Sequence, residues 1–313
     1  MRFVVLGAGA MGSVFGARLH LGGAEVTLLD VNEAHIAAVR ETGLSVALDE
    51  GTQVLDIPIM RPEVFEDPAD LILLFTKIFH TDAALQTIRR HLNSTPVLSL
   101  QNGIGNVERI ARHLPMERIL IGMTMTPAEF IAPGKVASYG PATTQFHAAD
   151  GQHRQLLDDI AAAMRAGGID AAIDPDIQAA IWEKAAFNCA MNGLCALSNA
   201  TPGAIGASEA GRTLAFEVAD EAVSVARASG VAADPDKVRA LMRHAFAQHL
   251  FHEASMLQDR KAGRRTEIDA LNGAVSETAA RLGIATPANN TIARLVRLFE
   301  DAKDWMTHHQ SKA

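Results

Sequence analysis

The sequence predicts an α/β protein in which an N-terminal, doubly wound sheet of the Rossmann type is joined to an all-helical C-terminal domain. In the first part of the chain, short apolar runs alternate with helical patterns, which is typical of a parallel sheet. From Asp174-Pro175 onward, helical stretches dominate and are separated by Gly or Pro. A length of 313 residues suffices for two domains of ordinary size. We therefore expect one domain over residues 1–173 and a second over residues 174–313.

The first predicted strand ends in a glycine-rich turn. The apolar run Phe3–Leu6 is followed by Gly7-Ala8-Gly9-Ala10-Met11-Gly12, which matches the G-x-G-x-x-G pattern between strand and helix. Gly7 allows a tight turn, Gly9 lets the backbone approach a pyrophosphate, and Gly12 lets the helix pack closely on the sheet. The phosphates then meet a helix N-terminus, whose free N–H groups favour an anion. Residues 7–12 therefore predict a dinucleotide site.

The second predicted strand carries the acidic residue that belongs to this pattern. The first helix stops near Gly22-Gly23, and the strand Glu25–Leu29 then ends in Asp30. An acid about 20 residues beyond the glycines hydrogen-bonds the ribose 2′-hydroxyl of NAD, whereas an NADP site needs a cation for the 2′-phosphate. Asp30-Val31-Asn32 supplies no cation. We expect NAD(P)H as cofactor, with NADH favoured by Asp30.

The remaining elements follow the same two patterns. In the first domain we expect strands at Leu71–Phe75, Pro96–Leu100, Ile119–Met123 and Ile169–Ile173, a helix at Thr81–Leu92, a helix carrying Leu156 to Met164, and antiparallel additions at Lys135–Tyr139 and Thr143–His147. In the second domain we expect helices at Ile177–Leu197, Glu209–Ser229, Pro235–Leu257, Glu267–Leu282 and Pro287–Lys303. A substrate is expected at the carboxyl ends of the strands, facing the helical domain.

Composition excludes several classes of protein. Hydrophobic residues make up 48% and charged residues 20% of the chain, as in a globular enzyme, and the net charge of −8 argues against a nucleic-acid partner. No apolar run approaches the roughly 20 residues that span a bilayer, so we expect a cytoplasmic protein that does not bind membranes. Cys189 and Cys195 are expected to pack in the core, and no spacing indicates a metal site. Apolar helical faces are compatible with a homodimer.

A polar stripe marks the first helix of the second domain. Lys184, Asn188 and Asn192 recur at every fourth residue, so they share one face of a helix whose neighbours are largely apolar. Spacing alone leaves two interpretations open, a solvent-facing stripe or the wall of a polar cleft.

A second polar segment runs from Ser255 to Asp269. Thr266 and Asp269 resemble a capping box, which would place Glu267 in the first turn of a helix. That location favours an ionised carboxylate, and its simplest role is to complement the helix dipole.

Five motifs in order resemble the ketopantoate reductase (2-dehydropantoate 2-reductase) family. They are GAGAMG, Thr76-Lys77, Gln101-Asn102-Gly103, the Lys-x3-Asn-x3-Asn stripe, and SMLQD followed by TEID-x2-NG. The resemblance covers essentially the whole chain. It implies an NAD(P)-dependent oxidoreductase that reduces the C2 ketone of 2-dehydropantoate to (R)-pantoate in pantothenate biosynthesis.

The resemblance also implies residue roles. Lys184 matches the catalytic lysine and Glu267 the essential carboxylate, which would orient the substrate or Lys184. Hydride addition leaves charge on the carbonyl oxygen, which an ammonium group can stabilise and protonate, provided that desolvation lowers its pKa from about 10.4. Asn102, Asn188, Asn192 and Ser255 match substrate-contacting positions, and Lys77 and Asn102 match positions near the ribose and nicotinamide. Without the resemblance, Lys77 is equally well a solvated lysine and Asn102 a turn residue.

The sequence departs from the family at two positions. Asp30 stands where members commonly carry a basic residue, and His252, placed on a helix, stands where many have Asn, so that it would reshape the substrate pocket. Relatives with an acid at the first position act as NAD-dependent D-2-hydroxyacid dehydrogenases on C3-branched 2-oxo acids, which is the main alternative. The 3-hydroxyisobutyrate dehydrogenase class and a non-enzymatic NAD sensor explain fewer of the motifs.

Overall fold

The computed structural model describes residues 1–310, and the chain folds into two compact units. The first contains Met1–Gln101 and Asn106–Ile177, and the second contains Asn102–Gly105 and the chain from Gln178 onward. Residues 311–313, which the sequence assigns to the helical domain, lie outside the described residues. The short stretch Asn102–Gly105 groups with the second unit because the backbone N–H of Ile104 donates to the carbonyl of Ala270, at 3.0 Å.

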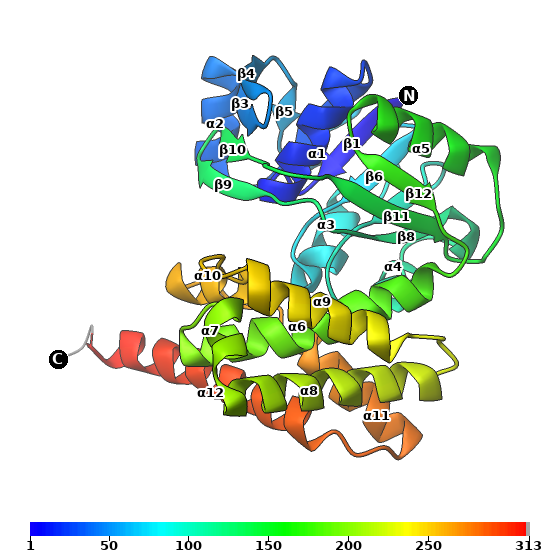
Figure 1. The fold of residues 1–313 in the computed structure, drawn as a ribbon. Coiled ribbons are helices and arrows are strands. Elements are labelled where there is room, and N and C mark those ends of the chain that lie inside the picture. Colours follow the sequence, from blue (N-terminus) through cyan, green and yellow to red (C-terminus); the bar gives the residue numbers. More distant parts are fainter. Residues whose placement is uncertain (311–313) are drawn as a thin grey trace. The chain divides into compact units, whose positions relative to one another are not determined.

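The first unit contains an eight-stranded sheet, in the order β12-β11-β8-β7-β6-β1-β2-β5 (Figure 1). Its strands are β1 (Arg2–Leu6), β2 (Glu25–Leu29), β5 (Ile59–Met60), β6 (Leu71–Leu74), β7 (Val97–Ser99), β8 (Ile119–Thr124), β11 (Thr143–Ala148) and β12 (Asp170–Ile173). All neighbouring strands are parallel except β8 and β11, which confirms the antiparallel addition expected at Thr143–His147. The central strands are buried on both faces, which explains their unbroken apolar sequences.

The strand order reverses between β1 and β6, which are neighbours in this sheet. Since parallel crossovers are right-handed, the connections that follow β1 and β6 leave the sheet towards opposite faces. In open sheets of this kind, ligands bind at the carboxyl ends of the strands at this point. The helices of this unit are α1 (Ala10–Leu21), α2 (Glu33–Thr42), α3 (Thr81–Thr87), α4 (Asn106–Ile110) and α5 (Gln155–Ala166). Helix α3 is shorter than the predicted Thr81–Leu92 because residues beyond Thr87 form turns, in which His91 and Arg90 hydrogen-bond the Phe65 carbonyl.

A second, four-stranded sheet packs against α1 in the order β4-β3-β10-β9. It consists of β3 (Leu44–Leu48), β4 (Gly51–Leu55), β9 (Glu129–Ala132) and β10 (Lys135–Ala137). The prediction that Lys135–Tyr139 extends the main sheet is therefore wrong, because β10 pairs in parallel with β3 and antiparallel with β9. Buried His35 of α2 links the turn between β9 and β10 to that helix by accepting the Gly134 backbone N–H at 3.0 Å.

The second unit is helical. Its elements are α6 (Ile177–Ser198), α7 (Pro202–Ala207), α8 (Glu209–Ala228), α9 (Pro235–Gln248), α10 (Ser255–Lys261), a 3-10 turn (Ile268–Ala270), α11 (Asn272–Leu282) and α12 (Pro287–Gln310). The single helix predicted over Pro235–Leu257 is wrong, since it breaks at residues 249–254. Two groups at the start of α7 bind carbonyls there: Gly203 N–H donates to His249 O at 3.2 Å, and Oγ1 of Thr201, the residue before α7, donates to Leu250 O at 2.8 Å.

Candidate active site

The glycine turn after β1 has the geometry that a dinucleotide phosphate requires. Gly7 has φ +98°, and a Cβ there would lie 2.7 Å from Thr76 N; a Cβ on Gly12 would lie 2.0 Å from Gly7 O. These two glycines are therefore required by the fold itself. A Cβ on Gly9 would meet nothing within 4 Å, so Gly9 is not needed for packing. Gly9 directly precedes α1, and the first backbone N–H groups of a helix favour an anion.

Gln101 joins the carboxyl ends of β6 and β7. Its buried side-chain amide donates to Thr76 O at 2.7 Å and to Thr81 Oγ1 at 2.9 Å, while its oxygen accepts from Ser99 Oγ at 3.0 Å. The residue after Thr76 is the partly buried Lys77, at the start of a 3-10 turn (Ile78–His80). Gln101 thus fixes the segment that presents Lys77. Sequence reasoning gave Gln101 no role, although it stands in the QNG motif.

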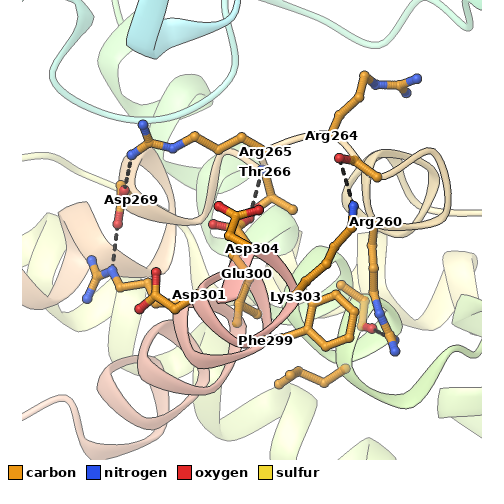
Figure 2. A pocket seen from close by; sticks show the side chains of 15 residues that line it. Arg260, Arg264, Arg265, Thr266, Asp269, Phe299, Glu300, Asp301, Lys303 and Asp304 are labelled. Atoms are coloured by element: carbon orange, nitrogen blue, oxygen red, sulfur yellow. Dashed lines mark hydrogen bonds and ion pairs between the residues drawn. The ribbon is translucent and has the colours of Figure 1, made fainter. Parts of the chain in front are cut away.

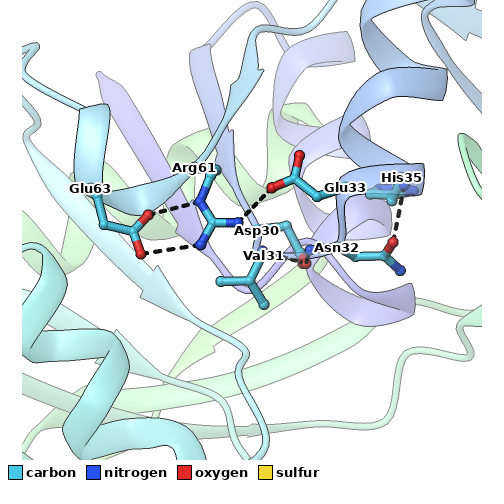
Figure 3. Close-up of polar contacts among 7 residues, drawn as sticks. All are labelled: Asp30, Val31, Asn32, Glu33, His35, Arg61 and Glu63. Carbon is cyan, nitrogen blue, oxygen red and sulfur yellow. Dashed lines mark hydrogen bonds and ion pairs between the residues drawn. The ribbon is translucent and has the colours of Figure 1, made fainter.

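The end of β2 holds a cluster of charges (Figure 3). Asp30 Oδ1 accepts the backbone N–H groups of Val31 and Asn32, both at 2.8 Å, which fixes the carboxylate at the strand end. Beside it lies Arg61, which follows β5 directly and whose Nη1 is 2.5 Å from Glu33 Oε1. Arg61 also contacts Glu63 at 3.3 Å. The residues next to Asp30 in sequence contain no cation, but pairing of β5 with β2 brings one to the same place, and sequence reasoning missed it.

The polar stripe of α6 is buried rather than solvent-facing. Asn188 and Asn192 are 9% and 6% exposed, and Lys184 is partly buried. Burial lowers the pKa of the Lys184 ammonium to about 8, and the negative charge of Glu267 opposes this decrease. Of the two interpretations of the stripe, the solvent-facing one is therefore wrong. A largely protonated lysine whose proton is more acidic than usual suits a group that must donate near neutral pH.

Glu267 lies just before the 3-10 turn rather than inside a helix, so its predicted place in the first turn of a helix is wrong. Thr266 Oγ1 accepts the Ile268 N–H at 3.4 Å, but the turn ends at Ala270 and α11 begins only at Asn272. Asp269 takes no part in capping, because it pairs with Arg297 at 2.6 Å and with Arg265 at 3.1 Å. The Glu267 side chain is 8% exposed.

Helix α12 holds the segment that leads to Glu267 (Figure 2). Glu300 Oε1 accepts the Thr266 backbone N–H at 2.8 Å, and Lys303 Nζ donates to Gly263 O at 2.9 Å. These residues border a cavity of about 460 Å³ whose walls mix arginines with carboxylates. Thr266 is in that wall, whereas none of the predicted substrate residues is. The cavity thus borders the residue before Glu267, and the contacts of Glu300 and Lys303 hold residues 263–266 in its wall.

A buried asparagine connects the Glu267 segment to α6. Asn272, fully buried at the start of α11, donates from Nδ2 to Cys189 O at 3.1 Å and to Asn289 Oδ1 at 3.0 Å. Cys189 follows Asn188 in the polar stripe. The loop that contains Asn102 packs closely on Ala270, which follows Glu267 by three residues. The approach is so close that a Cβ on Gly103 would lie 2.6 Å from Ala270 O. The second unit thus groups the α6 stripe, the Glu267 segment and the Asn102 loop.

The structure places His252 outside a helix and Ser255 at the start of a separate short helix. His252 is exposed and lies between α9 and α10, so its assignment to a helix is wrong; its ring centroid is 5.4 Å from that of His249. Ser255 is the exposed first residue of α10. The same helix is anchored to the end of α6, because Arg260 donates to the carbonyl of Ala196, one turn beyond Asn192.

Other chemistries find little support in the described part of the chain. Cys189 and Cys195 are free and buried, and burial raises the pKa of Cys195 to about 12, so both behave as core residues, as expected. Among the side chains that the structure describes, no group of three His, Cys, Asp or Glu is placed to hold a metal ion. No helix within residues 1–310 combines the length and apolarity needed to cross a bilayer.

Comparison with known proteins agrees with this geometry. The family model described as ketopantoate reductase PanE/ApbA matches residues 3–151, and the model for its C-terminal part matches residues 176–300. The chain is 36% identical over 303 residues to 2-dehydropantoate 2-reductase of Halobacterium salinarum, covering 95% of this chain and 98% of that protein.

Two solved structures are similar over nearly the whole chain. A D-mandelate dehydrogenase in a ternary structure with NADH and anilino(oxo)acetate has a TM-score of 0.92 at 33% identity, covering 96% of this chain and 99% of its own. The 2-dehydropantoate 2-reductase of Geobacter metallireducens has a TM-score of 0.89 at 30% identity, with 95% and 99% covered.

Proposed function

The chain belongs to the ketopantoate reductase PanE/ApbA family, and on that premise we propose that it reduces 2-dehydropantoate to (R)-pantoate with a nicotinamide cofactor. The observation that carries the proposal is Lys184. It lies on a buried polar stripe, has a pKa near 8, and interacts electrostatically with Glu267.

The residues of the first unit fit the cofactor. The pyrophosphate is assigned to the open space above Gly9, at the N-terminus of α1. A ribose hydroxyl is assigned to the Asp30 carboxylate. Lys77 is assigned to the nicotinamide end, at the carboxyl end of β6. When bound, the reduced nicotinamide supplies the hydride that adds to the C2 carbonyl carbon of the substrate.

Lys184 then acts on the oxygen of that carbonyl. As the new C–H bond forms, the electron pair of the C=O π bond moves to oxygen, and the Lys184 ammonium stabilises this charge and gives it a proton. Glu267 favours the charged form of Lys184 and so keeps the proton available. Asn102, Asn188, Asn192 and Ser255 are assigned to the carboxylate and hydroxyl groups of the substrate, because neutral hydrogen-bonding groups suit a small polar acid.

A second candidate is an NAD-dependent D-2-hydroxyacid dehydrogenase that acts on C3-branched 2-oxo acids. The TM-score of 0.92 to a D-mandelate dehydrogenase supports it, together with Asp30 at the end of β2. In this case the exposed His252 would help to shift the substrate preference from ketopantoate to C3-branched 2-oxo acids. Both candidates use the same Lys184 chemistry and differ only in the substrate.

We also propose that NADH is preferred over NADPH, because Asp30 accepts hydrogen bonds from a ribose hydroxyl but repels a 2′-phosphate. The free, buried cysteines support a reducing compartment such as the cytoplasm. We propose that the protein forms a homodimer, which apolar helical faces allow, and that its partners include neither nucleic acid nor membrane. Light scattering of the purified protein tests the assembly.

Initial rates with NADH and NADPH, each against ketopantoate and 2-ketoisovalerate, test the proposal. A higher kcat/KM for ketopantoate supports the reductase, whichever cofactor is faster. A higher value for 2-ketoisovalerate supports the dehydrogenase. Absence of turnover with all four pairs, in protein that binds NADH, would overturn both.

A further inference from the structure

Arg61 lies at the end of β5, opposite Asp30, the residue that the dinucleotide-binding pattern assigns to the adenosine ribose. Strand β5 pairs with β2 in parallel, with Leu28 opposite Ile59 and Leu29 opposite Met60, so the next residues, Asp30 and Arg61, are opposite each other at the strand ends. The Asp30 backbone N–H also donates to Met60 O at 3.1 Å. Neighbouring strands are about 4.8 Å apart, so the Arg61 side chain starts within reach of anything that Asp30 binds.

Two glutamates hold the Arg61 guanidinium. Glu33 Oε1 is 2.5 Å from Nη1, and the Glu63 carboxylate spans Nε and Nη2 at 3.3 and 3.4 Å (Figure 3). Glu33 lies in the first turn of α2, directly after the Asp30 loop, and Glu63 lies in the 3-10 turn Pro62–Val64 after β5. The guanidinium therefore has carboxylates on two of its edges, supplied by the two segments that border the ribose position.

The charge balance at this place is unfavourable for a phosphate. Asp30, Glu33 and Glu63 set three carboxylates against one arginine. A 2′-phosphate carries up to two further negative charges and is best bound by a free, bidentate guanidinium. The ion pairs are solvent-exposed, with side-chain exposures of 44% for Arg61, 70% for Glu33 and 47% for Glu63. Exposed pairs contribute little to stability, so removing the two carboxylates should leave the fold intact.

We propose that Arg61 is a phosphate-binding cation withheld by Glu33 and Glu63, so that these two glutamates, and not Asp30 alone, exclude NADPH. The inference rests on the proposed function, since it assumes a nicotinamide cofactor at the Gly7–Gly12 turn. It assigns Arg61 as a specificity-determining residue: once released, its guanidinium binds the 2′-phosphate.

The test measures binding of NADH and NADPH by titration calorimetry, with no oxo acid present. In the double variant Glu33→Gln/Glu63→Gln we expect NADPH to bind at least about tenfold more tightly, and NADH to change by less than about threefold. Adding Arg61→Ala to that variant should abolish the gain. The matched control, Glu66→Gln/Glu117→Gln, removes the same charge at residues that precede strands β6 and β8, and should leave both affinities unchanged.

Unchanged NADPH affinity in the double variant, or a gain that persists without Arg61, would overturn the inference. Because the three side chains are exposed, thermal melts of all variants should match the wild type, and NADH binding serves as the check of an intact site. Failure to reduce ketopantoate, with NADH binding intact, would contradict the proposed function and leave this inference standing.

Discussion

Replacing Lys184 with Met should lower the catalytic rate but raise the free energy of unfolding, so that the two effects of this lysine can be measured separately. Methionine keeps the length and apolar stem of lysine but cannot carry the charge or the proton. The pKa of Lys184 decreases from 10.5 to about 8. At about 1.4 kcal/mol per pKa unit, the charged form is disfavoured in the folded state by at most about 3 kcal/mol at neutral pH. That figure already contains the favourable interaction with Glu267, so the variant should unfold less readily at pH 7.

The sign of the pH dependence follows from the same shift. Between pH 8 and 10.5, unfolded Lys184 still binds a proton that the folded protein has released. The stability of the wild type therefore rises with pH across this window, by the amount that the charge costs at pH 7. The Lys184→Met variant lacks this contribution, so its stability advantage should be present at pH 7 and shrink towards pH 10.5. Denaturant unfolding at both pH values measures it.

Activity should change in the opposite direction. Loss of the proton donor should lower kcat by about 10³-fold or more, with NADH affinity within about twofold of the wild type. In the wild type, kcat/KM for reduction should fall above a pH of about 8, as Lys184 loses its proton. Lys237→Met, which changes an exposed lysine of α9, is the matched control and should alter neither rate nor stability appreciably. A variant that keeps a tenth of the wild-type rate would refute proton donation by Lys184, and a less stable one would refute the burial argument.

Three further changes test the parts that position the site. Gly9→Ala should leave the melting temperature unchanged, because the new Cβ meets nothing within 4 Å, but it should weaken NADH binding at least about tenfold in calorimetry. Gly12→Ala, by contrast, should lower the melting temperature. Unchanged NADH affinity in Gly9→Ala would contradict the phosphate assignment. Asn272→Ala should reduce the free energy of unfolding, measured in urea, by about 2 kcal/mol, because it leaves the buried Cys189 O and Asn289 Oδ1 atoms without their donor. A loss below about 0.5 kcal/mol would contradict the role of Asn272 in joining α11 to α6. Glu300→Gln should lower kcat several-fold with little change in NADH affinity, since it weakens the contact that holds Thr266, and an unchanged kcat would mean that this contact does not position Glu267.

The sequence carried enough information for the central sheet and most helices because their patterns are local. The runs at β1, β6, β7 and β8 are apolar on both faces, and α6 and α8 begin and end within a residue or so of their predictions. Strands β3, β4, β5 and β9 were missed. In β4 the first four of its five residues are exposed, so it lacks the alternation of a half-buried strand.

The missed features depend on contacts between distant residues. No Gly or Pro marks the break at residues 249–254; it is produced by hydrogen bonds from Thr201 and Gly203. In the site, the spacing of Lys184, Asn188 and Asn192 gave the shared face but could not decide its burial. Arg61 is 31 positions from Asp30 in sequence, and only the pairing of β5 with β2 brings the two together. Local patterns thus predict elements, whereas the partners of charged groups depend on topology.

The same dependence explains why a costly lysine persists on α6. A buried ammonium is costly unless a carboxylate or hydrogen-bonding group is held near it in good geometry. Here the opposing carboxylate, Glu267, stands on a short 3-10 turn with little rigidity of its own. Its position is imposed from two sides, by Asn272, which bonds to α6, and by Glu300 of α12, which bonds to Thr266. Both contacts hold segments that neighbour the two charges, Thr266 next to Glu267 and Cys189 on the helix of Lys184. The acidity of Lys184 is therefore a property of the packing of three helices as much as of its immediate neighbours.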